Sequence, residues 1–299
     1  MMTKCRISIG ALLCAAFIAG MLAACAPKAI PPAARPATVA IVLGAGAVKG
    51  FAHVGVLKVL EAQKVPIHMV VGTSAGSLVG SLYAYGFSAQ QLQTMAYALE
   101  LDDLIDLALP DNGFVKGEKL ESYVNRMVRD TPIERFRIPF HAVATDIKTG
   151  EEFVFGTGNA GMAVRASCAI PGIFKPSRIS GRTFSDGGIV SPLAIDIARR
   201  YGADAVIAVD ISSGIAPATP QGMVETILQS VDIMYAKIAA LQLPRADVVI
   251  RPAVGHIGST DFIRKGEAMI EGEKAARAAM PAIQAMLSSL RQKGRLPVQ

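Results

Sequence analysis

The sequence has little of several features that define common classes of protein. Charged residues make up only 18% of its 299 residues, beside 52% hydrophobic residues, which excludes global disorder. Lysine and arginine exceed aspartate and glutamate only by 30 to 24 and form no run of five, so no nucleic-acid partner is expected. The 28 glycines follow no three-residue period, which excludes a collagen. The length fits one large α/β domain or two small ones.

Cysteine is also scarce, and the chain has only Cys5, Cys14, Cys25 and Cys168. These residues form no C-x-x-C pair, and no cysteine and histidine have the spacing of zinc ligands. Three of the four lie within the first 25 residues, which leaves one free thiol in the rest of the chain. We therefore expect no disulfide framework, no metal and no cofactor.

The first 25 residues have the layout of a secretory signal. Lys4 and Arg6 precede an apolar stretch of 16 residues over 7–22, shorter than the roughly 20 residues of a membrane-spanning helix. The stretch ends in Leu-Ala-Ala-Cys25, and small residues before a cysteine resemble the bacterial lipobox. That resemblance implies that residues 1–24 are a removed lipoprotein signal peptide and that Cys25 receives a diacylglycerol. The alternatives are an ordinary cleaved signal with a chance cysteine, or an uncleaved anchor.

A proline-rich tether is expected over residues 25–37. Four prolines in ten residues favour an extended polyproline II spacer between a membrane and the following domain. Ala26 after the cysteine, by the same resemblance, favours the periplasmic face of the outer membrane. We therefore expect a lipid-anchored protein of the bacterial cell envelope. Loss of residues 1–24 removes Lys4 and Arg6 and no acidic residue, so the net charge falls from +6 to +4.

Strand and helix patterns alternate from about residue 38. The uninterrupted apolar run 39–43 ends in glycines, which is typical of a buried parallel strand, and a helical pattern over 54–60 follows it. Further strands are predicted at 68–72, 140–145, 152–155, 205–211 and 247–250. Further helices are predicted at 78–85, 90–99, 118–128, 192–201, 223–241 and 267–290. This alternation predicts an α/β fold of three layers, α/β/α, with a mostly parallel central sheet in one domain over 38–299.

The pattern Gly72-Thr-Ser74-Ala-Gly76 stands between the second predicted strand and the next helix. Gly-x-Ser-x-Gly in that context is typical of a nucleophile elbow, because the glycines let the backbone turn sharply without Cβ clashes and lift the serine out at the end of the strand. The helix directs its positive dipole end to the same place. Ser74 is therefore the predicted nucleophile, and the alternative is a serine that only caps the helix.

A glycine-rich segment, Gly44-Ala45-Gly46-Ala47-Val-Lys49-Gly50, follows the first predicted strand. Its free amides at the start of a helix suit an anion. A dinucleotide site would need G-x-G-x-x-G and an acidic residue near the end of the second strand, but Lys49 holds the place of the third glycine and no such acid is present. We therefore favour an oxyanion hole beside Ser74.

A third segment ends in Ser185-Asp186-Gly187-Gly188. Asp-Gly by itself is a common signal for a type I′ hairpin turn. Its functional interpretation is a carboxylate, Asp186, held in a tight turn from which it reaches the nucleophile.

These three segments, in this order, resemble the patatin-like phospholipases, and most closely the bacterial branch related to neuropathy target esterase. The similarity extends through 50–57, 144–146 and 165–174. It implies a patatin-like fold and a Ser–Asp dyad of Ser74 and Asp186, with residues 44–50 as the oxyanion loop. The family's near-continuous glycine run is interrupted by Ala45 and Ala47, whose amides suit this role only if neither residue needs a positive φ.

The resemblance also implies the reaction. We expect a serine esterase that cleaves carboxyl esters of phospholipids or lysophospholipids through an acyl-enzyme, with a lipid ester and the membrane as partners. Because an ordinary aspartate is a weak base at neutral pH, the dyad requires that desolvation raise the pKa of Asp186.

Two alternatives remain. Ser74, Asp210 and His256 stand in the Ser–Asp–His order of the α/β-hydrolases, although Gly255–Gly258 also reads as a simple turn. The other alternative is a catalytically weak lipoprotein that binds lipid or a partner. Most of the remaining polar candidates are expected to be structural: a turn at Asp146, an inert Cys168, and packed side chains at His53, His68 and His141. Arg165 could hold the loop of the dyad or meet an anionic head group, and a buried structural pairing is the favoured interpretation.

Overall fold

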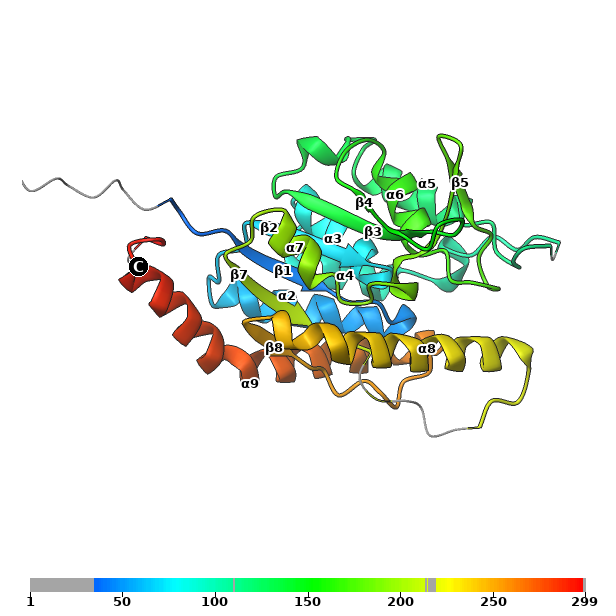
Figure 1. The fold of residues 1–299 in the computed structure, drawn as a ribbon. Coiled ribbons are helices and arrows are strands. Elements are labelled where there is room, and N and C mark those ends of the chain that lie inside the picture. Colours follow the sequence, from blue (N-terminus) through cyan, green and yellow to red (C-terminus); the bar gives the residue numbers. More distant parts are fainter. Residues whose placement is uncertain (1–34, 110, 213, 215–218, 298–299) are drawn as a thin grey trace, which may run out of the picture. The chain divides into compact units, whose positions relative to one another are not determined.

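A central sheet of eight strands organises the part of the chain that the structure describes (Figure 1). This computed structural model describes residues 35–109, 111–212, 214 and 219–297, so the predicted signal segment and Cys25 lie outside the described residues. Seven strands follow the order β5-β6-β3-β2-β1-β7-β8, and β4 pairs with β3. Their bounds are β1 (Val39–Leu43), β2 (Met69–Thr73), β3 (Phe140–Asp146), β4 (Glu152–Phe155), β5 (Ser177–Ile179), β6 (Arg182–Asp186), β7 (Ala205–Val209) and β8 (Val248–Ile250).

The sheet is mostly parallel, as the sequence predicts. Strands β3, β2, β1, β7 and β8 run parallel to one another, whereas β4 and β6 join β3 antiparallel and β5 joins β6 antiparallel. Every residue of β1, β2 and β7 is buried. Strands buried on both faces read as continuous apolar runs, which is why these three are recognisable in the sequence.

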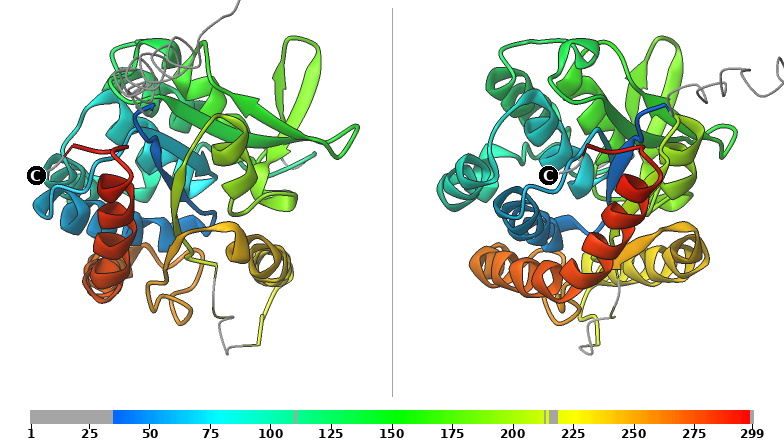
Figure 2. Two further views of the ribbon diagram at one scale, coloured as in Figure 1. Left: turned by 60° about the vertical axis from the view of Figure 1, so that its left-hand side comes forward. Right: turned by 90° about the vertical axis from the view of Figure 1, so that its left-hand side faces the viewer.

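Helices cover both faces of the sheet. Alternate residues of β1 point to opposite sides: Ile41 belongs to the core cluster under α2 and α9, whereas Val42 packs with Ile197 of α7. Figure 2 shows α2 and α9 on one side of the sheet and α7 and α8 on the other. The helices are α2 (Phe51–Ala62), α3 (Ala75–Tyr85), α4 (Ala89–Ala98), α5 (Glu118–Met127), α6 (Ala160–Ser167), α7 (Ile195–Arg200), α8 (Met223–Gln242) and α9 (Lys265–Gln292). The predicted α/β/α layering is confirmed.

Two local features differ from the sequence prediction. Helix α6 and the hairpin β5–β6 were not predicted, and the Asp186-Gly187 pair is not the hairpin turn. The turn lies at Ser180 and Gly181, whose φ angles of 50° and 78° are both positive, as a type I′ turn requires. Asp186 instead ends β6, at φ −51° and ψ 135°.

No helix within the described residues is both long and apolar enough to cross a membrane.

Candidate active site

Ser74 lies at a sharp turn between β2 and α3. Its backbone angles, φ 54° and ψ −124°, are rare for a residue with a side chain and are typical of strained functional turns. The flanking glycines provide space, because a Cβ on Gly76 would lie 2.0 Å from the carbonyl oxygen of Leu43. The Ser74 N–H donates to Ser167 Oγ at 2.9 Å, and the Ser167 hydroxyl donates to the Val143 carbonyl at 2.6 Å. Ser167, which sequence reasoning missed, thus fixes the turn.

Asp186 lies within hydrogen-bond distance of Ser74. The Ser74 hydroxyl donates to Asp186 Oδ2 at 2.6 Å, across 112 residues of sequence. The other carboxylate oxygen, Oδ1, accepts the Gly188 N–H at 2.7 Å, at the start of the short 3₁₀ turn that Gly187 begins. The sheet brings the two together, because β2 and β6 both flank β3.

The environment of Asp186 makes its carboxyl less acidic. The residue is fully buried, and this desolvation raises its pKa from 3.8 to about 6. Hydrogen bonds from Ser74 and Gly188 favour the charged form and oppose part of that rise. A carboxylate with a pKa near 6 is ionised at neutral pH and is a stronger base than an ordinary aspartate.

Only part of the glycine-rich segment has free amides. The N–H of Gly44 donates to the Val209 carbonyl at 3.1 Å, and that of Ala45 donates to the Pro192 carbonyl at 3.0 Å. The Lys49 amide donates to the Gly46 carbonyl at 3.1 Å. These three amides, predicted as part of an oxyanion hole, are therefore committed to main-chain hydrogen bonds.

The amides of Gly46, Ala47 and Val48 donate to no other group in the described part of the chain. Ala47, Val48 and Gly50 also line the cavity in front of Ser74. Ala47 has φ 48°, so it does adopt the left-handed conformation, which costs an alanine roughly 1–2 kcal/mol. The condition that neither alanine needs a positive φ therefore fails at Ala47.

His53 supports the segment from α2. Its Nε2 donates to the Gly44 carbonyl at 2.9 Å. Burial lowers the pKa of His53 to about 4, so the imidazole is neutral. His53 is thus a packed residue, as expected.

The Lys49 side chain contacts α8. It is fully buried and pairs with Asp232 at 2.8 Å, and Asp232 also accepts the Ser259 hydroxyl at 2.8 Å. Three residues along α8 from Asp232, Tyr235 places its ring against Gly188, and its buried hydroxyl has no hydrogen-bond partner among the described residues. No sequence motif marks Asp232 or Tyr235, because their partners are distant in the sequence.

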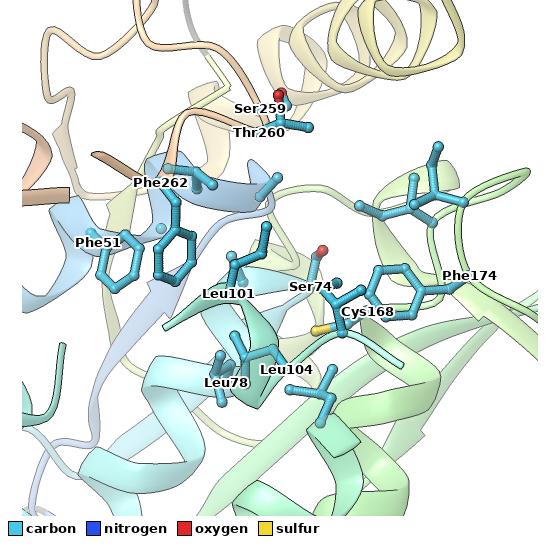
Figure 3. A pocket seen from close by; sticks show the side chains of 18 of the residues that line it. Phe51, Ser74, Leu78, Leu101, Leu104, Cys168, Phe174, Ser259, Thr260 and Phe262 are labelled. Atoms are coloured by element: carbon cyan, nitrogen blue, oxygen red, sulfur yellow. The ribbon is translucent and has the colours of Figure 1, made fainter. Parts of the chain in front are cut away.

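An apolar cavity of about 320 Å³ lies in front of Ser74 (Figure 3). Cys168 lies in its wall, and burial raises the pKa of this thiol well above its usual range, so it stays neutral and inert as expected. The other lining side chains drawn and labelled in the figure are mostly large and apolar: Phe51, Leu78, Leu101, Leu104, Phe174, Phe262, Ser259 and Thr260.

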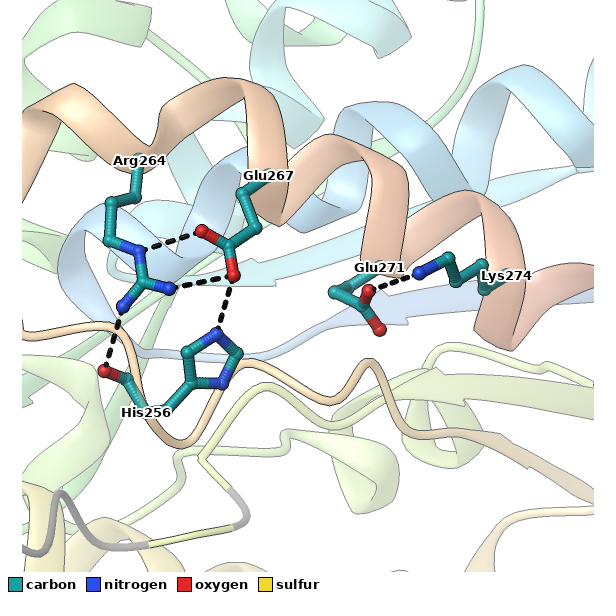
Figure 4. A network of polar contacts seen from close by, with 5 residues as sticks. All are labelled: His256, Arg264, Glu267, Glu271 and Lys274. Carbon is teal, nitrogen blue, oxygen red and sulfur yellow. Dashed lines mark hydrogen bonds and ion pairs between the residues drawn. The ribbon is translucent and has the colours of Figure 1, made fainter.

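The alternative triad is not assembled. His256 Nε2 contacts Glu267 at 2.7 Å in an exposed network with Arg264 (Figure 4). Asp210 accepts the Ser212 hydroxyl at 2.7 Å. Neither residue contacts Ser74, whose hydroxyl is donated to Asp186.

The other polar candidates have structural partners. Arg165 pairs with Glu121 at 3.0 Å, and Asp146 turns β3 into β4 while pairing with Arg182. His68 Nδ1 accepts the Val39 N–H, and the His141 ring packs against the Tyr201 ring at a centroid distance of 4.0 Å. Within the described residues, no group of three or more histidine, cysteine, aspartate or glutamate side chains is placed to hold a metal ion.

The fold and the site together define a class: an α/β/α protein with a serine at a sharp turn between a strand and a helix and a buried aspartate beside it. The model of the patatin-like phospholipase family matches residues 41–199, which is more than half of the chain. The chain therefore belongs to the patatin-like phospholipase family.

Individual relatives agree with this assignment. Patatin-like phospholipase domain-containing protein 6 of Homo sapiens is 36% identical over 184 residues, covering 59% of this chain and 13% of that protein. An NTE family protein of Mycobacterium tuberculosis is 28% identical over 269 residues, covering 81% of this chain and 46% of that protein. VipD from Legionella pneumophila shares the fold, with a TM-score of 0.57 at 12% identity over 89% of this chain and 73% of VipD. The chain spans about half or less of the length of the curated relatives.

Proposed function

We propose that the protein is a serine esterase that hydrolyses carboxyl esters of phospholipids or lysophospholipids. The observation that carries this proposal is the 2.6 Å contact between Ser74 and Asp186 at an apolar cavity, in a member of the patatin-like phospholipase family. An apolar cavity suits an acyl chain and a serine–carboxylate pair suits acyl transfer.

In the proposed reaction, Asp186 Oδ2 takes the Ser74 proton as Ser74 Oγ attacks the ester carbonyl. The hydrogen bond from Gly188 holds Oδ1, which leaves Oδ2 directed at the serine. The alcohol leaves with the proton, and the acyl group stays on Ser74 as an ester. Asp186 then takes a proton from a water molecule as this water attacks the ester, and it returns the proton to Ser74 Oγ as the fatty acid leaves.

The oxyanion donors in this proposal are the amides of Ala47 and Val48, which are free of other described partners and line the cavity. The positive dipole end of α3 reinforces them, because Ser74 is its N-cap residue. The cavity volume of about 320 Å³ is near the lower end for ligand pockets, so we propose that it holds a single acyl chain.

Hydrolysis by the purified full chain tests the proposal. We expect fatty-acid release from phospholipid or lysophospholipid, and its loss in Ser74→Ala and Asp186→Asn. Ser81→Ala is the matched control, because Ser81 is a buried serine of α3, the helix that Ser74 precedes, and its hydroxyl donates only to the Leu78 carbonyl. Turnover that survives Ser74→Ala would contradict the proposal.

We also propose that Cys25 carries the acyl anchor and holds the protein at the envelope membrane. The support is the sequence alone: the apolar stretch over 7–22 and Leu-Ala-Ala before the cysteine. Metabolic labelling with an alkyne fatty acid should mark the wild-type protein and leave Cys25→Ser unlabelled. Equal labelling of both would refute the anchor without bearing on the esterase.

A further inference from the structure

A second cavity of about 310 Å³ has a lining that differs in character from the first. Three cationic residues, Arg165, Lys175 and Arg178, line it together with a single acidic residue, Glu121. The excess of positive charge distinguishes it from the apolar cavity in front of Ser74.

The local ion pairs leave this excess in place. Glu121 pairs with Arg165 Nη1 at 3.0 Å. The partner of Lys175 is Asp111, whose side chain is 60% exposed, and such solvent-exposed pairs are weak. Arg178 forms no ion pair with any residue that the structure describes. The lining therefore retains positive charge that an anion would neutralise.

Two buried polar atoms in this lining lack a partner. The Arg165 Nε and the Ser177 Oγ have no hydrogen-bond partner among the described residues, and Ser177 is only 2% exposed. Both residues line the second cavity. Buried polar atoms are nearly always paired in proteins, so two orphans at one cationic cavity indicate a missing acceptor.

The two cavities share a wall at Phe174. Phe174 lines the first cavity and the next residue, Lys175, lines the second. On the same wall, a Cβ built on Gly117 would lie 3.2 Å from Arg165 Cγ and 3.4 Å from the Phe174 ring, so Arg165 and Phe174 converge at this point. A ligand that bridges the wall would present an apolar group to one side and an anion to the other.

We propose that the second cavity is a phosphate subsite, in which Arg165, Lys175 and Ser177 bind the head-group phosphate of the lipid ester. Lys175 Nζ and Ser177 Oγ would each donate a hydrogen bond to a phosphate oxygen, and the Arg165 guanidinium would add positive charge beside it, since arginine and lysine are the usual partners of phosphate. This inference rests on the proposed function, because it deepens the substrate of the Ser74 site. Inorganic phosphate offers the same chemistry, so the experiment separates the two sources.

The test compares two substrates that differ only in the phosphate. The full chain is assayed on a 1-acylglycerol 3-phosphate and on the monoacylglycerol with the same acyl chain. The quantity recorded is kcat/KM for the phosphate-bearing substrate divided by kcat/KM for the monoacylglycerol. We expect Lys175→Ala and Ser177→Ala each to lower this ratio at least tenfold and Lys175→Arg to preserve it. Arg200→Ala is the control, because Arg200 is an exposed cation outside the cavity. A ratio that is the same in the wild type, Lys175→Ala and Ser177→Ala would overturn the head-group assignment.

A binding experiment identifies the source of the anion. Inorganic phosphate is titrated with the wild type and Lys175→Ala, and ³¹P line broadening is measured. Broadening lost in Lys175→Ala, together with the changed ratio, supports a head-group site. Broadening lost while the ratio is unchanged means that the cavity holds free phosphate, which refutes the head-group role. If the wild type releases no fatty acid from these two substrates or from any other phospholipid or lysophospholipid, the proposed function fails, and absent broadening would then separately refute the subsite.

Discussion

Replacing Asp186 by asparagine should stabilise the protein while abolishing its activity. Asparagine has the same shape, its carbonyl oxygen can accept the Gly188 N–H, and its amide can face Ser74 Oγ, so the hydrogen bonds of the site survive the change. What the change removes is a fully buried carboxylate. The base required for the proposed reaction is therefore the group that destabilises the fold.

The magnitude follows from the raised pKa. In the folded protein the pKa of Asp186 is about 6 rather than 3.8, and at 1.36 kcal/mol per pKa unit this corresponds to about 3 kcal/mol. Because the folded pKa is the higher one, the protonated carboxyl supports the fold below pH 4, and that contribution is lost as the pH rises through 6. Asparagine does not titrate and keeps the contribution at every pH.

Urea unfolding of the wild type and Asp186→Asn between pH 4 and pH 8 measures the difference. The unfolding free energy of the variant should exceed that of the wild type by an amount that grows by about 2 kcal/mol between pH 4 and pH 7, because the unfolded carboxyl is already about half ionised at pH 4. A difference that does not change with pH would refute the reasoning, since it would mean that Asp186 has the same pKa in the folded and unfolded chain.

Three further perturbations test the geometry. The kcat/KM for a soluble ester should rise with pH through an apparent pKa of about 6, because Asp186 must be ionised to act as the base; a pH-independent rate down to pH 4 would contradict this role. Ser167→Ala leaves the buried Ser74 N–H without its acceptor and should lower the unfolding free energy by about 1–3 kcal/mol, measured against Ser81→Ala in urea. Gly188→Ala would place a Cβ 2.3 Å from the Tyr235 ring, so turnover should fall sharply and the unfolding free energy should fall by about 1–3 kcal/mol. Unchanged turnover and stability would contradict this by showing that Tyr235 moves aside without cost.

The sequence predicts those parts of the fold that rest on local patterns. The central strands are buried on both faces and therefore appear in the sequence as continuous apolar runs. The amphipathic helices appear as apolar residues that recur at helical spacing. Helix α6 is only eight residues long and was missed, although Asn159 is an N-cap whose side chain accepts the Met162 N–H, a signal that was present. The β5–β6 hairpin is not predicted because the strong turn signal, Asp186-Gly187, stands at the end of β6. The turn that joins the two strands lies at Ser180 and Gly181, which carry a weaker signal.

The candidate site likewise has features that local sequence patterns predict and features that they do not. The motifs of Ser74 and Asp186 are visible because each depends on neighbouring residues. Which amides of the glycine-rich segment are free is not visible in the sequence. It depends on the Val209 and Pro192 carbonyls, which accept the N–H groups of Gly44 and Ala45. The Lys49–Asp232 pair spans 183 residues and carries no local signal. Only the folded chain reveals such partners.

The central claim is that Ser74, activated by Asp186, carries the acyl group. The most direct measurement is intact-protein and peptide mass spectrometry after rapid acid quenching of the full chain with a slowly hydrolysed ester. The proposed reaction predicts one acyl adduct, located on the Ser74 peptide in the wild type and absent in Ser74→Ala and Asp186→Asn. Turnover without any adduct on Ser74, or an adduct on another residue that persists in Ser74→Ala, would contradict it.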